Sequence, residues 1–183
     1  LIFAVNALNE GTIFGLVTFE SNSYVDIVPT KINNNNRENL ITTIKNLKTR
    51  GGTNIMSGLV KCKELYDSIQ TSNKNIIMLS DGEDYNLNVN NCDMRMQECF
   101  GIEPNIKLDT VGYGPDANTQ LLVKISSFTS GTYALCYDAS MVGTIIGRAM
   151  VRTYAGTGVY GIDANNDNTT NDYHFFRQEL SEI

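Results

Sequence analysis

The alternation of short apolar runs with amphipathic segments most constrains the fold of this 183-residue chain. Runs rich in β-branched and aromatic residues are typical of strands, whereas apolar residues spaced three and four apart are typical of helices. The expected strands are residues 12–20, 23–29, 74–81, 106–112 and 131–137, and the expected helices are residues 1–8, 36–47, 56–69, 118–128 and 140–154. Strands that alternate with helices predict an α/β fold with a doubly wound, mostly parallel sheet and helices on both faces.

Two of the expected strands differ in pattern from the rest. Residues 12–20 are almost continuously apolar, which suits a strand covered on both faces. Residues 23–29 alternate between apolar and polar side chains and follow after a turn at residues 21–23. We therefore expect residues 23–29 to form one antiparallel edge strand of the sheet.

The length of the chain is that of a single domain with a short appendage. We expect the domain to cover residues 1–153, and the Gly-, Asn- and Asp-rich residues 154–183 to be a polar linker or the start of a further element. Residues 83–105 are polar and are expected to form a long functional or variable loop with a little helix.

Charge and hydropathy argue against two classes of partner. The formal net charge is −6 and the Lys and Arg residues are scattered, so the chain lacks the basic patch that nucleic-acid binding requires. No apolar run approaches the roughly 20 residues needed to cross a bilayer. Residues 1–5 are apolar but lack the basic region and cleavage site of a signal peptide. We expect neither nucleic-acid binding nor membrane insertion.

The four cysteines do not form a disulfide framework. Cys62 lies in a helical pattern and Cys136 in a strand pattern, where buried free thiols are usual. Cys92 and Cys99 flank a polar hexapeptide and could pair. The count leaves the cellular compartment open, with a lean towards an intracellular location, and the oligomeric state is also open.

Two polar motifs are expected to meet at one edge of the sheet. Asp81, Glu83 and Asp84 follow directly after the expected strand 74–81, and a Gly-Gly-Thr loop ending at Thr53 precedes a helix. Ligands of open α/β sheets collect at the carboxyl ends of the strands, and carboxylate and hydroxyl oxygens suit a hard divalent cation. The alternative is structural: Asp81 would begin a turn and Thr53 would be the N-cap of the helix.

Other motifs in the sequence give weaker evidence for a functional site. Residues 163–167 resemble the first half of an EF-hand loop, but Asn168 stands where that loop needs glycine and His174 where it needs glutamate. A solvated loop is the expected structure there. No phosphate-binding glycine loop or nucleophile elbow occurs, and no nucleophile–base pair supports an enzyme.

Four segments together resemble the von Willebrand factor type A (VWA) domain. They are GGTNI at residues 51–55, IIMLSDGED at 76–84, LDTVGYG at 108–114 and LLVKISSFTSGTYALCYDASMV at 121–142. The resemblance covers roughly residues 1–152 in the family's order. It implies a Rossmann-like sheet with a metal-ion-dependent adhesion site (MIDAS) at its upper face.

In that family the metal, usually Mg²⁺, is held by a D-x-S-x-S loop after the first strand, by a threonine and by an aspartate. Thr53 matches the threonine and Asp81 the aspartate, whereas no D-x-S-x-S occurs before Thr53. The chain opens in what the resemblance makes the helix after that motif. We therefore expect the first, central strand and its motif to lie ahead of Leu1. Binding of Mg²⁺, or of Mn²⁺ or Ca²⁺, is expected only with those ligands.

The resemblance implies a non-enzymatic protein-binding module whose metal ion engages an acidic residue of a protein partner. The alternative is a structural or assembly component, for example of a large complex or virion, that keeps the fold with a vestigial or incomplete metal site.

Overall fold

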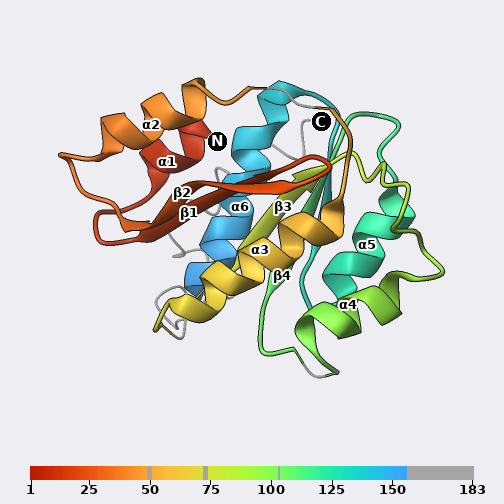
Figure 1. The fold of residues 1–183 in the computed structure, drawn as a ribbon. Helices are drawn as coiled ribbons and strands as arrows, with labels where there is room; N and C mark the ends of the chain where they lie inside the picture. The colour runs from red at the N-terminus through yellow and green to blue at the C-terminus, as the bar shows by residue number, and fades with distance from the viewer. Residues whose placement is uncertain (49–50, 72–73, 103, 156–183) are drawn as a thin grey trace, which may run out of the picture.

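The computed structural model describes residues 1–48, 51–71, 74–102 and 104–155, in which helices pack around two small β-sheets (Figure 1). The strands are β1 (Ile13–Phe19), β2 (Ser23–Lys31), β3 (Ile76–Ser80), β4 (Leu108–Tyr113) and β5 (Tyr133–Cys136). The helices are α1 (Ile2–Ala7), α2 (Arg37–Lys45), α3 (Ile55–Ser68), α4 (Cys92–Phe100), α5 (Thr119–Phe128) and α6 (Ala139–Ala155). The α/β class predicted from the sequence is confirmed.

Strands β1 and β2 form an antiparallel hairpin. Val17 pairs with Val25 and Phe19 with Ser23, and a register shift interrupts the ladder on both sides of Leu16. The amide of Glu20 donates to the carbonyl of Asn22 at 2.7 Å and closes the turn. The antiparallel strand predicted from the alternating pattern is therefore present.

Strands β3, β4 and β5 form a parallel sheet in that order. Met78 pairs with Thr110, and Val111 pairs with Ala134. β4 lies between two neighbours, and its residues from Leu108 to Gly112 are all buried. A strand covered on both faces and paired on both edges requires such a continuously buried run.

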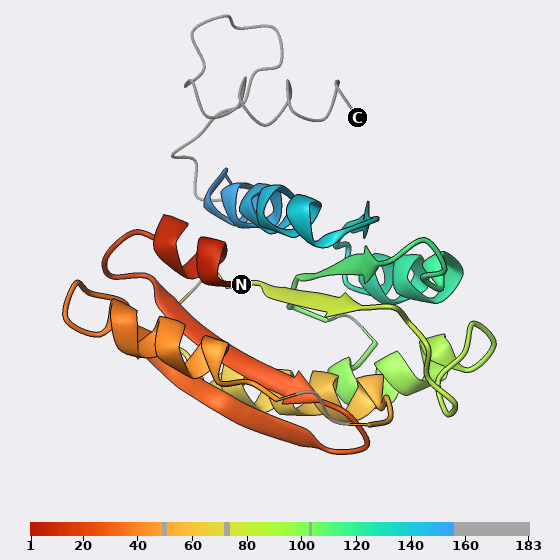
Figure 2. The same ribbon diagram turned by 90° about the horizontal axis from the view of Figure 1, so that it is seen from above.

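Helices cover both faces of this parallel sheet, as predicted. Ile76 and Met78 of β3 pack into a core with α3, α4 and α5, whereas Ile77 and Leu79 pack with α6. Figure 2 shows α3 and α6 on opposite sides of the sheet. A separate cluster joins α1 and α2 to the hairpin, with Val5 and Ile32 at its centre.

The sheet is interrupted between β1 and β3. The sequence predicts one mostly parallel sheet whose central first strand lies ahead of Leu1, and within the described residues β1 and β3 belong to two separate sheets. Each keeps one paired edge, β1 with β2 and β3 with β4. The interruption falls at the position where the sequence analysis expects the first, central strand of the sheet.

The predicted polar loop at 83–105 contains a nine-residue helix, α4. Its buried residues Cys92, Met96 and Phe100 are spaced four apart and face the core of α3 and α5. The sequence left open whether Cys92 pairs with Cys99, and in the structure both thiols are free. Seven residues of helix separate them by about 10 Å along the axis, beyond the roughly 7 Å limit between the Cα atoms of a disulfide.

Several predictions fall partly or wholly on residues that the structure does not describe. The predicted linker at 154–183, the EF-hand-like residues 163–167 and His174 lie outside the described residues, apart from the last residues of α6. The domain boundary at residue 153 stays a prediction. Within the described residues, every helix is too short or too polar to cross a bilayer.

Candidate metal centre

A cavity of about 360 Å³ lies between β1 and β3, and we call it the β1–β3 slot. Its walls are residues 16–19 from β1 and residues 76–81 from β3 and the turn that follows, and its floor is Gly58, Leu59 and Cys62 of α3. Leu1 and Thr53 also line the slot. The structure thus brings the two predicted metal ligands, Thr53 and Asp81, to one cavity.

Gly52 shapes the loop that carries Thr53. Its φ of +89° lies in the left-handed region that favours glycine. A Cβ at Gly52 would also lie 2.5 Å from the Oγ of Ser21, in the hairpin turn. The side-chain amide of Asn54 donates to the carbonyl of Ser21 at 3.3 Å. The loop is therefore fitted against the end of the hairpin.

Thr53 is not the N-cap of α3, so that structural alternative is wrong. The N-cap is Asn54, whose Oδ1 accepts from the amide of Ser57 at 2.9 Å. Thr53 is half-buried, and within the described residues its hydroxyl has no hydrogen-bond partner. The hydroxyl is therefore free, as far as the described residues go, to bind a ligand in the slot.

Asp81 sits on a tight turn after β3, as the structural alternative for this residue predicts. Gly82 has a φ of +77°, and its amide donates to the Oγ of Ser80 at 3.0 Å. Oδ1 of Asp81 accepts from the amide of Glu83 at 3.1 Å. Within the described residues Oδ2 has no partner, and the side chain is exposed. The turn and a metal ligand are compatible, because one carboxylate oxygen remains available.

Asp84 has a structural role that the sequence analysis missed. Its Oδ2 accepts from the amide of Ile55 at 2.7 Å, at the start of α3. Its Oδ1 accepts from the amides of Asn86 at 2.7 Å and Leu87 at 3.1 Å. A carboxylate at a helix N-terminus is favoured by the helix dipole. Asp84 therefore ties the loop after β3 to α3 and is occupied by backbone donors.

Two of the described residues have the chemistry of metal ligands. Thr53 and Asp81 offer one hydroxyl and one carboxylate, which are oxygen ligands that Mg²⁺ accepts. No group of three or more His, Cys, Asp or Glu side chains gathers for a metal within the described part of the chain. Their chemistry fits an oxygen-bound divalent cation, whose remaining ligands would be water or other oxygen groups.

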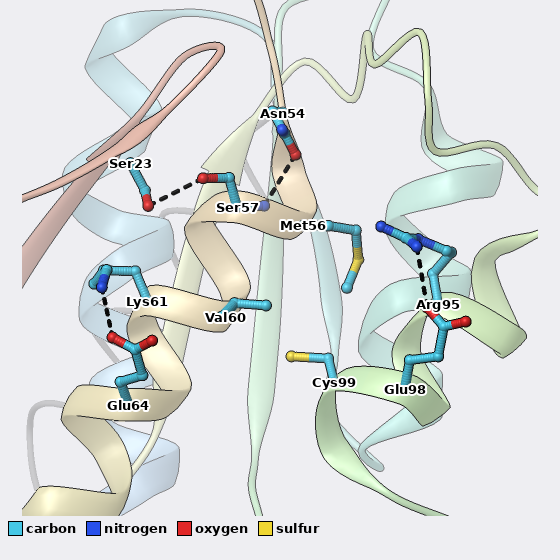
Figure 3. A pocket seen from close by; sticks show the side chains of 10 residues that line it. All are labelled: Ser23, Asn54, Met56, Ser57, Val60, Lys61, Glu64, Arg95, Glu98 and Cys99. Carbon is cyan, nitrogen blue, oxygen red and sulfur yellow. Dashed lines mark hydrogen bonds and ion pairs between the residues drawn. The ribbon is translucent and has the colours of Figure 1, made fainter.

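A second cavity lies in the groove between α3 and α4 (Figure 3). Its walls carry two ion pairs, Lys61 with Glu64 and Arg95 with Glu98, each within one helix. Burial raises the pKa of the Cys99 thiol in this groove to about 11. The thiol is therefore protonated at neutral pH and a poor nucleophile. The groove offers mixed charges and no candidate chemistry.

Known proteins match most of the chain. The family profile of the von Willebrand factor type A domain matches residues 1–143. The mouse calcium-activated chloride channel regulator 1 is 30% identical over 142 residues, which cover 75% of this chain and 14% of that protein. The chain thus spans about a seventh of the length of that relative.

Solved structures show the same fold. A von Willebrand factor type A protein from Catenulispora acidiphila superposes with a TM-score of 0.69 at 22% identity, covering 83% of this chain and 35% of that one. Proximal thread matrix protein 1 from the mussel byssus, with a zinc-occupied MIDAS motif, superposes with a TM-score of 0.54 at 17% identity, covering 80% and 38%. With the matched profile and the fold in agreement, the chain belongs to the von Willebrand factor type A domain family.

Proposed function

We propose that this chain is a non-enzymatic protein-binding module that presents a divalent metal ion to an acidic residue of a protein partner. One observation carries the proposal: Thr53 and Asp81 line one cavity, each with an oxygen that is free within the described residues. The two residues come from different loops, which meet because the N-terminal end of α3 lies beside the loop that follows β3, as the hydrogen bond from the amide of Ile55 to Asp84 shows.

The donor set explains why the partner would be acidic. Thr53 is neutral and Asp81 carries one negative charge, so these two ligands leave a divalent ion with net positive charge. Such an ion attracts a carboxylate, which can complete its coordination. Mg²⁺ is the expected ion, with Mn²⁺ or Ca²⁺ as substitutes. The further oxygen ligands would come from the D-x-S-x-S loop that we expect ahead of Leu1, so metal affinity depends on that segment.

The family supports this proposal at a coarser level. VWA domains commonly mediate protein–protein interactions, and the mussel byssus protein has a zinc-occupied MIDAS motif. That protein shares only 17% identity with this chain, so the likeness between them is one of fold alone. The metal and the acidic partner are therefore proposed from the positions of Thr53 and Asp81.

Calorimetric titration with Mg²⁺ tests the proposal on the polypeptide that includes the residues ahead of Leu1. Loss of a residue that only hydrogen-bonds to a metal ligand already lowers metal affinity by about 10- to 100-fold. Loss of a ligand itself, in Asp81→Ala, should therefore weaken Mg²⁺ binding by at least about tenfold. Glu83→Ala is the matched control, since Glu83 is an exposed neighbouring carboxylate whose side chain holds no hydrogen bond within the described residues. Equal Mg²⁺ affinity in the two variants would contradict the assignment of Asp81.

A structural or assembly component is the second candidate function. It is favoured by the absence, within the described residues, of a group of three or more His, Cys, Asp or Glu side chains that could hold a metal ion. In this case the fold would make its contacts through other surfaces. Partner binding that is unaffected by EDTA and by Asp81→Ala would decide for this candidate.

A further inference from the structure

The groove between α3 and α4, which we call the α3–α4 groove, has an apolar floor. Its volume is about 390 Å³, and Met56 and Val60 of α3 and Cys99 of α4 lie between its two walls (Figure 3). Met56 is buried and Cys99 is half-buried, whereas Val60 is 43% exposed. Removing exposed apolar area from water favours association. An apolar floor between polar rims is typical of an interaction site.

Charged side chains line both rims of the α3–α4 groove, and they do so in the same order. Lys61 and Glu64 of α3 form an ion pair at 2.5 Å, and Arg95 and Glu98 of α4 form one at 3.0 Å. In each pair the cation precedes the anion by three residues. Figure 3 shows both cations nearer the Asn54 end of the groove and both anions nearer the opposite end. The groove is therefore positive at one end and negative at the other.

These two ion pairs leave their charges available to a partner. The four side chains are 34–57% exposed, and each pair joins neighbouring turns of a single helix. Exposed pairs of this kind hold their side chains only weakly, because water screens the attraction between the two charges. A partner charge that lies over the floor can therefore interact with both rims at once.

We propose that the α3–α4 groove binds an amphipathic helix of a partner protein, which runs along the groove in the direction of α3. Its apolar side chains would cover Val60, an acidic residue would lie at the positive end, and a basic residue would follow one turn later at the negative end. Charge complementarity with both rims argues for this partner. Glu placed four residues before Lys also stabilises the partner helix itself.

The walls of the groove favour a helix over an extended segment. Both walls are helices, α3 and α4, whose backbone amides are hydrogen-bonded within each helix beyond its first turn. An extended segment would find no ladder of backbone partners here, whereas a helix satisfies its own backbone groups. A third helix can also pack its side-chain ridges into the groove between two others.

A synthetic helix tests the proposal on the same polypeptide as the metal experiment. The probe is a fluorescent, alanine-based peptide of about 15 residues, with leucines three and four apart on one face and a Glu–Lys pair four apart beside them. The control peptide has glutamine at both charged positions. We expect saturable binding of the probe, and binding of the control about tenfold weaker, since four exposed ion pairs contribute about twofold each. A probe that does not bind up to about 1 mM, or a control that binds equally, overturns the proposal.

Exchanging the two charges of one rim is the sharpest variant. Lys61→Glu combined with Glu64→Lys keeps the composition, the net charge and the ion pair within α3, but it reverses the polarity of that rim. It should weaken probe binding by about tenfold. The matched control exchanges the next ion pair of α3, Lys63→Asp with Asp67→Lys, because neither residue lines the groove. Equal probe affinity in the two exchanged variants overturns the proposal.

A substitution on the floor tests the apolar contact separately. Val60→Arg should lower probe affinity at least about tenfold, because it removes the apolar area that the leucines would bury. Val123→Arg is the control, since Val123 is a 39%-exposed valine on α5 outside the groove. Circular dichroism verifies the fold of both variants, and the charge exchange on α3 decides the question for a Val60 variant that unfolds. Unchanged affinity in folded Val60→Arg overturns the proposal.

A second copy of this chain is the competing occupant of the groove. Sedimentation of the polypeptide alone distinguishes the two, because a helix of a different protein leaves it monomeric. A dimer that the charge exchange at Lys61 and Glu64 dissociates would overturn the assignment to a partner protein.

This inference goes beyond the metal proposal and does not rest on it. The α3–α4 groove and the β1–β3 slot share no lining residue. Probe binding should therefore be the same in EDTA and in Mg²⁺, and in Asp81→Ala. Loss of probe binding with intact Mg²⁺ binding removes the helix proposal alone, and the reverse result removes the metal proposal alone.

Discussion

Replacing Asp84 should destabilise the domain more than replacing either neighbouring carboxylate. Its carboxylate accepts from three backbone amides, and the amide of Ile55 belongs to a residue with no exposed surface. Hydrogen bonds to charged groups contribute about 1.5–3 kcal/mol when their partners are buried, and less where water can replace them. We assign about 2 kcal/mol to the bond from Ile55 and about 1 kcal/mol to the other two together. Asp84→Ala should therefore lower the free energy of unfolding by about 3 kcal/mol.

Urea denaturation followed by circular dichroism measures this loss. For a chain of this length, a loss of about 3 kcal/mol lowers Tm by roughly 6–12 °C. Asp84→Asn retains one acceptor oxygen and should lose about half as much. Glu83→Ala is the control and should stay within about 0.5 kcal/mol of the parent. A loss below about 1 kcal/mol for Asp84→Ala, with an unchanged m-value, would refute the structural role of this carboxylate.

Two further predictions concern single residues near the slot. Gly52→Ala should lower the free energy of unfolding by about 1–3 kcal/mol, because alanine is strained at a φ of +89° and its Cβ would collide with Ser21. Gly51→Ala is the control, because no atom lies within 4 Å of a Cβ at that position. Urea denaturation measures both variants. Burial raises the pKa of the Cys62 thiol from its ordinary value of 9.0 to about 11 in the folded chain. Because the thiol of the unfolded chain ionises first, stability should fall as pH rises from about 9 to 11. Cys62→Ala should reduce that slope in denaturation curves, and the slope that remains belongs to Cys92 and Cys99, whose thiol pKa values burial also raises to about 11.

The order of elements could be predicted because periodicity records which faces are buried. Helix α4 shows where the prediction was incomplete. Cys92, Met96 and Phe100 have a helical spacing, but because the residues around them are polar the segment was predicted as a loop with only a little helix. The buried stripe is narrow because α4 packs mainly against α3 and α5. A narrow stripe was the signal that could have revealed this helix.

The meeting of Thr53 and Asp81 could also be predicted, because ligand-binding loops of an open α/β sheet gather at the carboxyl ends of its strands, where Asp81 follows β3. The roles of their neighbours could not. Thr53 and Asn54 are both favoured N-cap residues, and only the backbone geometry selects Asn54. Asp84 accepts hydrogen bonds from backbone amides, and every residue type except proline has such an amide. No sequence pattern can therefore predict these hydrogen bonds.

Several residues of segment 51–59, one of the segments that resemble the family, have structural roles. Gly52 permits the turn, Asn54 caps α3 and donates to the hairpin, and Gly58 leaves room for the ring of Phe19, which a Cβ would approach to 2.8 Å. Each of these roles fixes α3 against the hairpin and so keeps the slot floor in place. Thr53 is the exception, since its hydroxyl has no structural bond within the described residues. A motif of this kind therefore identifies the fold strongly and the metal weakly, and the metal proposal depends on Thr53 and Asp81 alone.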